Sequence, residues 1–225
     1  MLTICSSATV AQAEKTPVVV ELYTSQGCSS CPPADAMLAE MSQFDHVIPL
    51  ALHVDYWDYI GWKDDFANPA HTRRQQNYAR AAGATTIYTP QFVVAGQDIV
   101  VGAKAMKLSD QIQAHSQVDL PVSLDLSQDG GQMSVGATWD DGTDPQPTVV
   151  QLVRVKAEET VDIRRGENAG HQLTYSNIVQ SWDVLSEWDG TAPLSLTVEV
   201  AQTDFVVVIV QAGTSGPILG AAKIN

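Results

Sequence analysis

Cysteine, positive charge and long apolar runs are scarce in this chain, and each scarcity excludes a class of protein. Three cysteines occur in 225 residues, and no second CxxC motif exists to complete a structural zinc site. No run of about 18 apolar residues is present, so we expect no membrane-spanning helix. The net charge of −14, from 12 Lys and Arg against 26 Asp and Glu, argues against nucleic-acid binding because phosphates require basic patches.

The composition that is present suits a globular, exported protein. Hydrophobic residues make up 44% of the chain and charged residues 17%, and the length allows one large domain or two modest ones. Residues 1–13 are typical of the end of a secretory signal peptide, because a short apolar stretch precedes the small-x-small triplet AQA. Cleavage after Ala13 would remove Cys5 and leave Cys28 and Cys31 in a periplasmic or secreted protein.

Strand-like and helix-like segments alternate in the first half of the chain. PVVVELY is β-branched and apolar, which predicts a buried strand. PPADAMLAEMSQF begins with prolines and carries one apolar face, which predicts a helix. The predicted order is β-α-β-α-β-β-α, with elements at residues 17–23, 32–44, 47–54, 69–82, 91–101 (a hairpin) and about 107–117.

The pattern changes near residue 119. Apolar and polar residues alternate around Gly130 and Gly131, which predicts a hairpin with one face in solvent. Short strands of this kind favour a β-sandwich, so we expect an α/β domain at residues 14–118 and an all-β, sandwich-like domain at 119–225. Further strands are predicted at about residues 148–156, 177–185, 193–200 and 205–211.

The segment QGCSSCPP places two cysteines between a predicted strand and a predicted helix. A helix N-terminus presents unpaired N–H groups and about half a positive charge. It therefore lowers the pKa of a thiol placed there and favours Cys28 as a nucleophile. Cys31 lies one helical turn on, where it can attack the resulting mixed disulfide and release the partner. The motif in this context predicts redox chemistry.

Other interpretations of the same residues remain open. A purely structural disulfide is one, although so small a loop stabilises a fold little. His53 ends the second predicted strand, and two thiolates with one imidazole suit copper or zinc. A periplasmic metal-binding protein or metallochaperone using Cys28, Cys31 and His53 is therefore the alternative function. A third class is a binding module formed by the β-rich half.

Two motifs together resemble the thioredoxin superfamily. ELYTSQGCSSCPPAD has the pattern in which CxxC opens a helix, and Thr89 and Pro90 precede the strand QFVV in the manner of the cis-proline loop that faces it. The match covers about residues 17–117. The resemblance implies that Cys28 attacks and Cys31 resolves.

The resemblance also implies roles for three further residues. Thr89 and Pro90 would position the partner's backbone, with Pro90 in the cis form that proline allows at low cost. Glu21 lies on the first predicted strand, where many relatives keep a buried acid behind the cysteines. Burial would raise the pKa of Glu21 and let it exchange a proton with Cys31.

A longer pattern resembles one bacterial secreted family. HVDYWDYIGWKDDFANP, YTPQFVV and RRGENAGHQLTYSNIVQSW together resemble the family catalogued as domain of unknown function twelve-twenty-three. This resemblance spans nearly the whole mature chain. It implies a thioredoxin-like domain followed by a β-rich part, and it names no substrate.

The leading hypothesis is an exported thiol–disulfide oxidoreductase that exchanges disulfides with protein or small-thiol partners through Cys28 and Cys31. It requires no bound cofactor besides the redox-active disulfide, whereas the alternative requires copper or zinc. The Ser-Ser pair between the cysteines differs from the dipeptides of thioredoxin reductants and strong oxidants. Because those dipeptides tune the potential, the direction of electron flow stays open.

Three other segments have two interpretations each. The aromatic residues of DYWDYIGWKDDF would form either an apolar rim for a peptide or plugs of the core. The arginines of the helix at 69–82 would either face solvent or stabilise the Cys28 thiolate. The polar segment RRGENAG would either connect two strands or pack over the CxxC cleft and select the partner.

Overall fold

The computed structural model describes residues 16–140, 142–201 and 205–224, so the predicted signal segment lies outside the described residues. The helices are α1 (Pro32–Met41), α2 (Pro69–Ala81) and α3 (Ala105–Ser116), with a short 3₁₀ turn, η1 (Asp58–Ile60). The strands are β1 (Val18–Thr24), β2 (Val47–His53), β3 (Gln91–Val94), β4 (Asp98–Val101), β5 (Val122–Asp129), β6 (Gln132–Trp139), β7 (Thr148–Asp162), β8 (Gln172–Trp188), β9 (Leu194–Glu199), β10 (Phe205–Gln211) and β11 (Ile218–Ile224).

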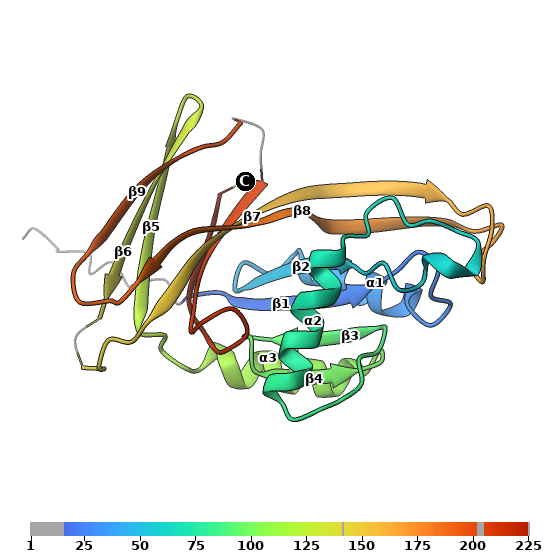
Figure 1. Cartoon of the computed structure of the whole chain (residues 1–225), viewed down its shortest axis with the longest axis horizontal. Coiled ribbons are helices and arrows are strands. Elements are labelled where there is room, and N and C mark those ends of the chain that lie inside the picture. Colours follow the sequence, from blue (N-terminus) through green and yellow to red (C-terminus); the bar gives the residue numbers. More distant parts are fainter. Residues whose placement is uncertain (1–15, 141, 202–204, 225) are drawn as a thin grey trace, which may run out of the picture.

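The chain is a mixed α/β protein with a large sheet and a small one. The large sheet has eight strands in the order β11-β10-β7-β8-β2-β1-β3-β4, and the small sheet has three in the order β5-β6-β9. β1 and β2 are parallel, β2 and β8 are parallel, and β1 and β3 are antiparallel. Figure 1 shows the small sheet at one end of the molecule and the helices around the other part of the large sheet.

β1 is buried along its whole length because helices cover both faces of the sheet there. Val20 and Leu22 pack with residues of α1 and α3 on one face. Val19 and Tyr23 point the opposite way, as the two-residue period of a strand requires, and pack with Tyr78 of α2. A strand of this kind carries a nearly continuous apolar run, which is the pattern that predicted it.

The helices expected from the sequence are present with shifted ends. α1 ends at Met41 rather than at residue 44, and Phe44 is half exposed instead of completing its apolar face. The predicted hairpin is present as β3 and β4, and its turn contains Ala95 and Gly96, both with positive φ. Glycine adopts this backbone conformation without steric cost.

The longest strands exceed the sequence prediction. β7 and β8 contain 15 and 17 residues, whereas apolar patterning predicted strands only at residues 148–156 and 177–185. The outer part of this pair is mostly polar and exposed, so hydrophobic periodicity does not mark it. Hydrogen bonding between the two strands extends the ladder to Asp162 and Gln172. β11 has no counterpart in the prediction.

The two halves of the chain contribute to one large sheet. β8 joins β2 through the pairing of Ala51 with Ile178, so four strands of the second half continue the sheet begun by β1–β4. The small sheet packs against the large sheet, because Met133 and Val135 of β6 share one hydrophobic core with Val206 of β10. The boundary expected at 118/119 falls between α3 and β5. The division into a thioredoxin-like domain and a separate sandwich stays a prediction.

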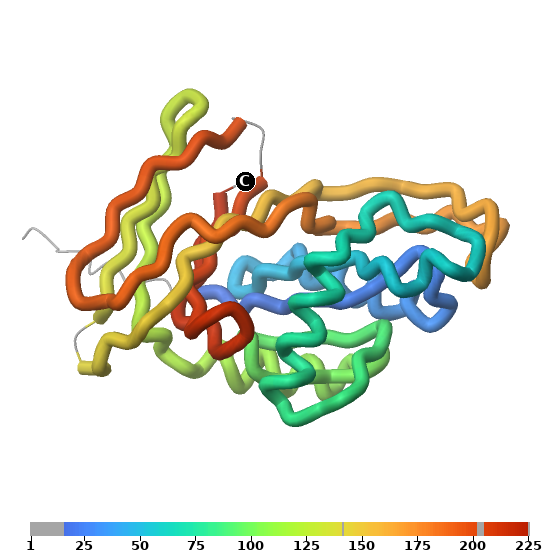
Figure 2. Tube along the Cα trace, viewed as in Figure 1, coloured from blue at the N-terminus to red at the C-terminus, as the bar shows by residue number. Residues whose placement is uncertain are grey.

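The connection between β7 and β8, residues 163–171, is called the strap below. Figure 2 shows the strap, the loop after β2 and the start of α1 at the same end of the molecule. Of the helices that the structure describes, none is long and apolar enough to cross a membrane.

Candidate functional site

A disulfide joins the two cysteines of the CSSC motif at the start of α1. The Cα atoms of Cys28 and Cys31 are 5.4 Å apart. Cys31 is the N-cap residue, and Pro32 and Pro33 follow in the first turn, where the missing N–H of proline breaks no helical hydrogen bond. Both cysteines are buried, with Cys28 only 1% exposed. The surrounding loops therefore cover the sulfur atoms.

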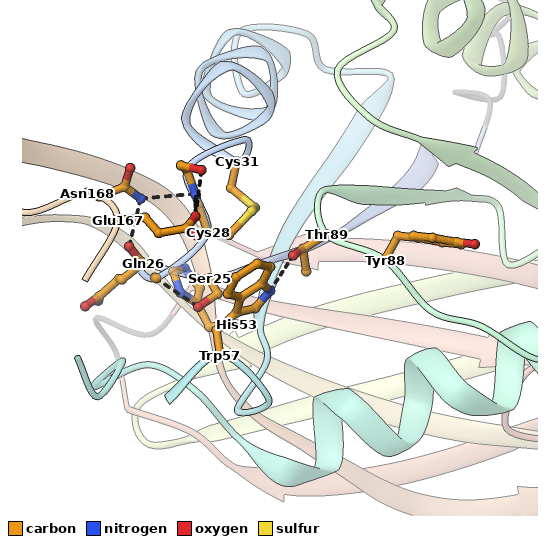
Figure 3. Close-up of a disulfide and its surroundings, with 12 residues drawn as sticks. Ser25, Gln26, Cys28, Cys31, His53, Trp57, Tyr88, Thr89, Glu167 and Asn168 are labelled. Carbon is orange, nitrogen blue, oxygen red and sulfur yellow. Dashed lines mark hydrogen bonds between the residues drawn. A yellow bond between two sulfur atoms is a disulfide. The ribbon is translucent and has the colours of Figure 1, made fainter. Parts of the chain in front are cut away.

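The loop before β3 lies next to this disulfide. Tyr23 of β1 pairs with Gln91 of β3, which brings the residues before β3 beside the loop that follows β1. The Thr89–Pro90 peptide bond is cis, as expected. The Trp57 indole N–H donates to the Thr89 hydroxyl at 2.7 Å, and Figure 3 shows this pair on one side of the disulfide.

Glu21 is fully buried, but it is the anion of an ion pair. Arg74 of α2 donates from Nε to one carboxylate oxygen at 2.7 Å and from Nη2 to the other at 2.8 Å. The Tyr23 and Tyr78 hydroxyls donate to the same two oxygens at 2.9 and 2.7 Å. Burial lowers the pKa of Arg74, but the charge of Glu21 outweighs it and raises that pKa overall, so the guanidinium stays charged.

Each oxygen of Glu21 thus accepts two hydrogen bonds, which is the capacity of a carboxylate oxygen. No lone pair is left to carry a proton for Cys31. The ion pair with Arg74, four residues before Tyr78, therefore argues against the proton relay expected at Glu21, a role that stays a prediction. The other two arginines of α2, Arg73 and Arg80, are exposed to solvent, which was one of the two interpretations.

A different acid lies behind the cysteines. Asp35 is four residues after Cys31, and its amide donates to the Cys31 carbonyl at 3.1 Å, so both side chains lie on one helix face. Asp35 is buried, and neither carboxyl oxygen has a well-aligned hydrogen bond among the described residues. Burial raises the pKa of Asp35 to about 7, and the charge of His53 and the nearby Thr24 hydroxyl oppose this only in part.

His53 faces the same interior. Its Nδ1 lies 2.7 Å from Asp64 Oδ2, and both side chains are fully buried. The same oxygen accepts the amide of Gln26 at 2.8 Å, and the other accepts the amide of Phe66 at 2.9 Å. Because an ionised carboxylate only accepts, Nδ1 of His53 carries the proton and a neutral ring has its lone pair on Nε2. That Nε2 has no partner in the described part of the chain.

Tyr175 of β8 completes this group. Its ring centroid lies 4.9 Å from that of His53. Its buried hydroxyl makes no hydrogen bond to any described residue. Burial and then the charges of Asp35 and Asp64 raise the pKa of Tyr175 well above its usual value, so the phenol stays protonated. We call Thr24, Asp35, His53 and Tyr175 the buried polar cluster.

The strap binds the backbone of the CSSC motif. Asn168 donates from Nδ2 to the carbonyl oxygens of Gln26 and Cys28, at 2.9 and 3.0 Å. Glu167 Oε2 accepts from the Ser29 amide at 3.2 Å and from the Ser29 hydroxyl at 2.6 Å. Figure 3 shows Glu167 and Asn168 against the cysteine loop. Of the two interpretations of RRGENAG, the structure places this segment on the CxxC loop.

The aromatic loop after β2 mostly fills the surroundings of the site. Trp57 reaches Thr89, and the Trp62 indole N–H donates to the Gln26 side chain at 2.8 Å. Phe66 packs edge-on against the His53 ring. Tyr59 differs, because it is 82% exposed.

The geometry gives the metal alternative no support. Within residues 16–140, 142–201 and 205–224, no three His, Cys, Asp or Glu side chains are grouped so that they could hold a metal ion. Asp64 already occupies one ring nitrogen of His53, and Cys28 and Cys31 are joined to each other.

Comparisons with known proteins agree with the fold seen here. The model of the family described as "Protein of unknown function (DUF1223)" matches residues 19–211, most of the chain.

The chain belongs to the DUF1223 family.

Two solved structures resemble this DUF1223 protein. A crystal structure of a protein from Agrobacterium tumefaciens is 32% identical, with a TM-score of 0.81, and the match covers 95% of this chain and 96% of that one. HBP35 of Porphyromonas gingivalis is 16% identical, with a TM-score of 0.65, over 93% of this chain and 75% of that one, which is a likeness of fold alone. No curated protein matched the chain.

Sequence reasoning missed the acid that this DUF1223 protein places behind its cysteines. The spacing of four between Cys31 and Asp35 was a usable signal, since it puts both on one helix face. Tyr175 and Asp64 gave no such signal. They come from β8 and from the loop after β2, and only the tertiary fold brings them to His53.

Proposed function

We propose that this protein is an exported thiol–disulfide oxidoreductase of the thioredoxin type, acting in the periplasm or outside the cell on protein or small-thiol partners. The observation that carries the proposal is the Cys28–Cys31 disulfide at the N-terminus of α1, beside the cis Thr89–Pro90 peptide. A helix N-terminus stabilises the thiolate that exchange requires, and the loop before β3 lies where it can hold a partner's backbone.

The exchange balances without a further cofactor. A partner thiolate attacks Cys28 Sγ, the new S–S bond forms, and the Cys28–Cys31 bond breaks with its electron pair on Cys31. A second partner thiolate then attacks the partner's sulfur in this mixed disulfide and leaves Cys28 as a thiolate. Two partner thiols become one disulfide, and the protein's disulfide becomes two thiols. The reverse sequence oxidises the protein and reduces the partner.

Asp35 is the proton carrier in this proposal. When Cys31 leaves as a thiolate, the protonated carboxyl of Asp35 supplies its proton. In the reverse direction the carboxylate takes the proton of the Cys31 thiol, so that the thiolate attacks the mixed disulfide. A pKa of about 7 suits both directions near neutral pH, because the group is then present in both forms.

Trapping with oxidised glutathione tests the order of attack. Cys31→Ser, once reduced, should gain the mass of one glutathione on Cys28, because the resolving thiol is missing. Cys28→Ser should stay unmodified under the same conditions, because the proposal assigns the attack on the partner to Cys28 and only the resolving step to Cys31. Mass spectrometry of the two variants, prepared as residues 14–225 so that Cys5 is absent, reads both outcomes. Equal modification of the two variants, or none in either, would contradict the assignment of Cys28 as the attacking thiol.

A further inference from the structure

We propose that Glu167 of the strap is a positioning residue that sets the reduction potential of the Cys28–Cys31 pair, by placing a carboxylate on the amide of Ser29. The inference rests on the proposed exchange function and deepens it. It gives the second half of the chain a role in the chemistry of the first half.

Hydrogen bonds between the strap and the CSSC loop hold Glu167 beside Ser29. Ser29 lies between the two cysteines, and its amide and hydroxyl both donate to Glu167 Oε2, at 3.2 and 2.6 Å. The neighbouring Asn168 is buried, and its amide group holds the carbonyl oxygens of Gln26 and Cys28. The strap is therefore attached to the CSSC loop on both sides of Cys28. These contacts hold the Glu167 carboxylate next to Ser29.

The strap also fits closely against the loop after β2. Gly166 has φ +79°, and a Cβ at this position would lie 3.2 Å from Ile60 Cδ1. Glycine is suited to both conditions, since it adopts positive φ readily and has no side chain to collide. The turn that carries Glu167 is thereby held between the CSSC loop and Ile60.

The charge of Glu167 acts differently on the two redox states. Its hydrogen bonds from the Ser29 hydroxyl and amide lower the pKa of Glu167, so the group is ionised at neutral pH. The disulfide is neutral and is not repelled by this charge. A Cys28 thiolate would be repelled, because like charges disfavour each other. The thiolate would also compete with Glu167 for the Ser29 amide, which donates to Glu167 Oε2 when the cysteines form the disulfide.

Both effects disfavour the reduced form, so Glu167 should keep the pair more reducing than its place at a helix N-terminus alone would make it. Glu167→Gln removes the charge and keeps an oxygen that accepts from Ser29. Glu158→Gln is the matched control, because Glu158 is an exposed glutamate of the same hairpin, paired in register with Ser176.

The experiment is a glutathione redox titration of the purified full chain and of both variants, read by thiol alkylation and mass. Glu167→Gln should favour the dithiol about tenfold more than wild type, which is ~30 mV toward a more oxidising potential. The difference should shrink in about 1 M salt because exposed charges are screened there. The pH dependence of Cys28 alkylation should also move to lower pH. Glu158→Gln should titrate as wild type does.

The outcomes separate the two proposals. Equal potentials for Glu167→Gln and wild type would overturn this inference and leave the exchange function standing. A shift that salt does not reduce would also overturn it, since a packing change and not a charge would then be responsible. If the wild-type pair does not titrate reversibly at all, the proposed function itself fails.

Discussion

Two buried carboxyl groups in this chain have opposite electrostatic surroundings. Glu21 meets a guanidinium and two phenols, whereas Asp35 has no ion-pair partner of this kind, and burial raises its pKa to about 7. A buried acid is costly when charged unless it is paired. Glu21 is therefore suited to holding the fold together, and Asp35 is suited to releasing and taking a proton.

Stability should reveal the raised pKa of Asp35. Folded Asp35 holds its proton up to about pH 7, whereas the unfolded chain releases it near pH 4. Between these values the folded state binds more protons, so its free energy of unfolding falls as pH rises, by about 4 kcal/mol in total. The free energy of unfolding of Asp35→Asn should not fall in this way. Its stability relative to wild type should therefore increase from pH 4 to pH 8. Urea denaturation of the oxidised proteins measures it, and a difference that is constant with pH would contradict the assignment.

The same variant should slow the proton-coupled step. At pH 8, Asp35→Asn cannot take the proton of Cys31, so release of glutathione from the Cys28 mixed disulfide should be about 100-fold slower, at the lower end of general-base effects. Stopped-flow fluorescence or quenched mass analysis follows this release. Asp65→Asn, an exposed acid of the loop after β2, is the control and should resolve at the wild-type rate. Equal rates for Asp35→Asn and wild type would exclude Asp35 as the carrier.

At the scale of elements, α2 connects the beginning and the end of the chain. Arg74 stacks 3.8 Å over the Trp182 ring of β8, and its Nη2 donates to the Gln211 side chain of β10 at 3.1 Å. The same guanidinium holds Glu21 of β1. The sequence pattern correctly predicts the helix but not this use of its arginine, because the pairing partner lies 53 positions away and on another layer.

Removing the guanidinium should destabilise the fold strongly. Arg74→Met leaves Glu21 charged and unpaired in the core, which costs about 3–5 kcal/mol. Glu21→Gln in the same chain should recover part of that loss, because the uncompensated charge is then gone. Arg73→Met, on the exposed side of the same helix, should change stability by less than about 0.5 kcal/mol. Denaturant midpoints compare the variants, and equal losses at the two arginines would contradict this account.

At the scale of the whole molecule, the site depends on both halves of the chain. Local periodicity predicted most of the helices and strands, because the buried face of each one appears as a repeat of apolar residues within a short stretch of sequence. It could not predict that β8 joins β2, because the register consists of one pair, Ala51 with Ile178. For the same reason Tyr175 and the strap could not be placed at the cysteines from sequence. The CSSC motif was predictable because its signal is local, whereas the cis form of Pro90 was implied by the resemblance to the thioredoxin superfamily.

A fragment of residues 14–118 should therefore not fold as the intact chain does. One hydrophobic core includes Leu50 of β2, Val153 of β7 and Ile209 of β10, and the fragment would expose the first of these and lose the other two. We expect no cooperative thermal transition for the fragment by circular dichroism. A fragment that unfolds cooperatively and exchanges disulfides at the rate of the full chain would instead support the domain division expected from the sequence.

The most direct test of the central claim is a redox titration of the purified, metal-free full chain against glutathione, with Cys28 and Cys31 read by alkylation and mass. The account predicts one reversible two-electron transition at a potential between thioredoxin-like and strongly oxidising values, about −270 to −120 mV. A pair that stays a disulfide under all but harsh reduction would contradict it and make the CSSC bridge structural. A pair that stays reduced throughout would contradict it as well.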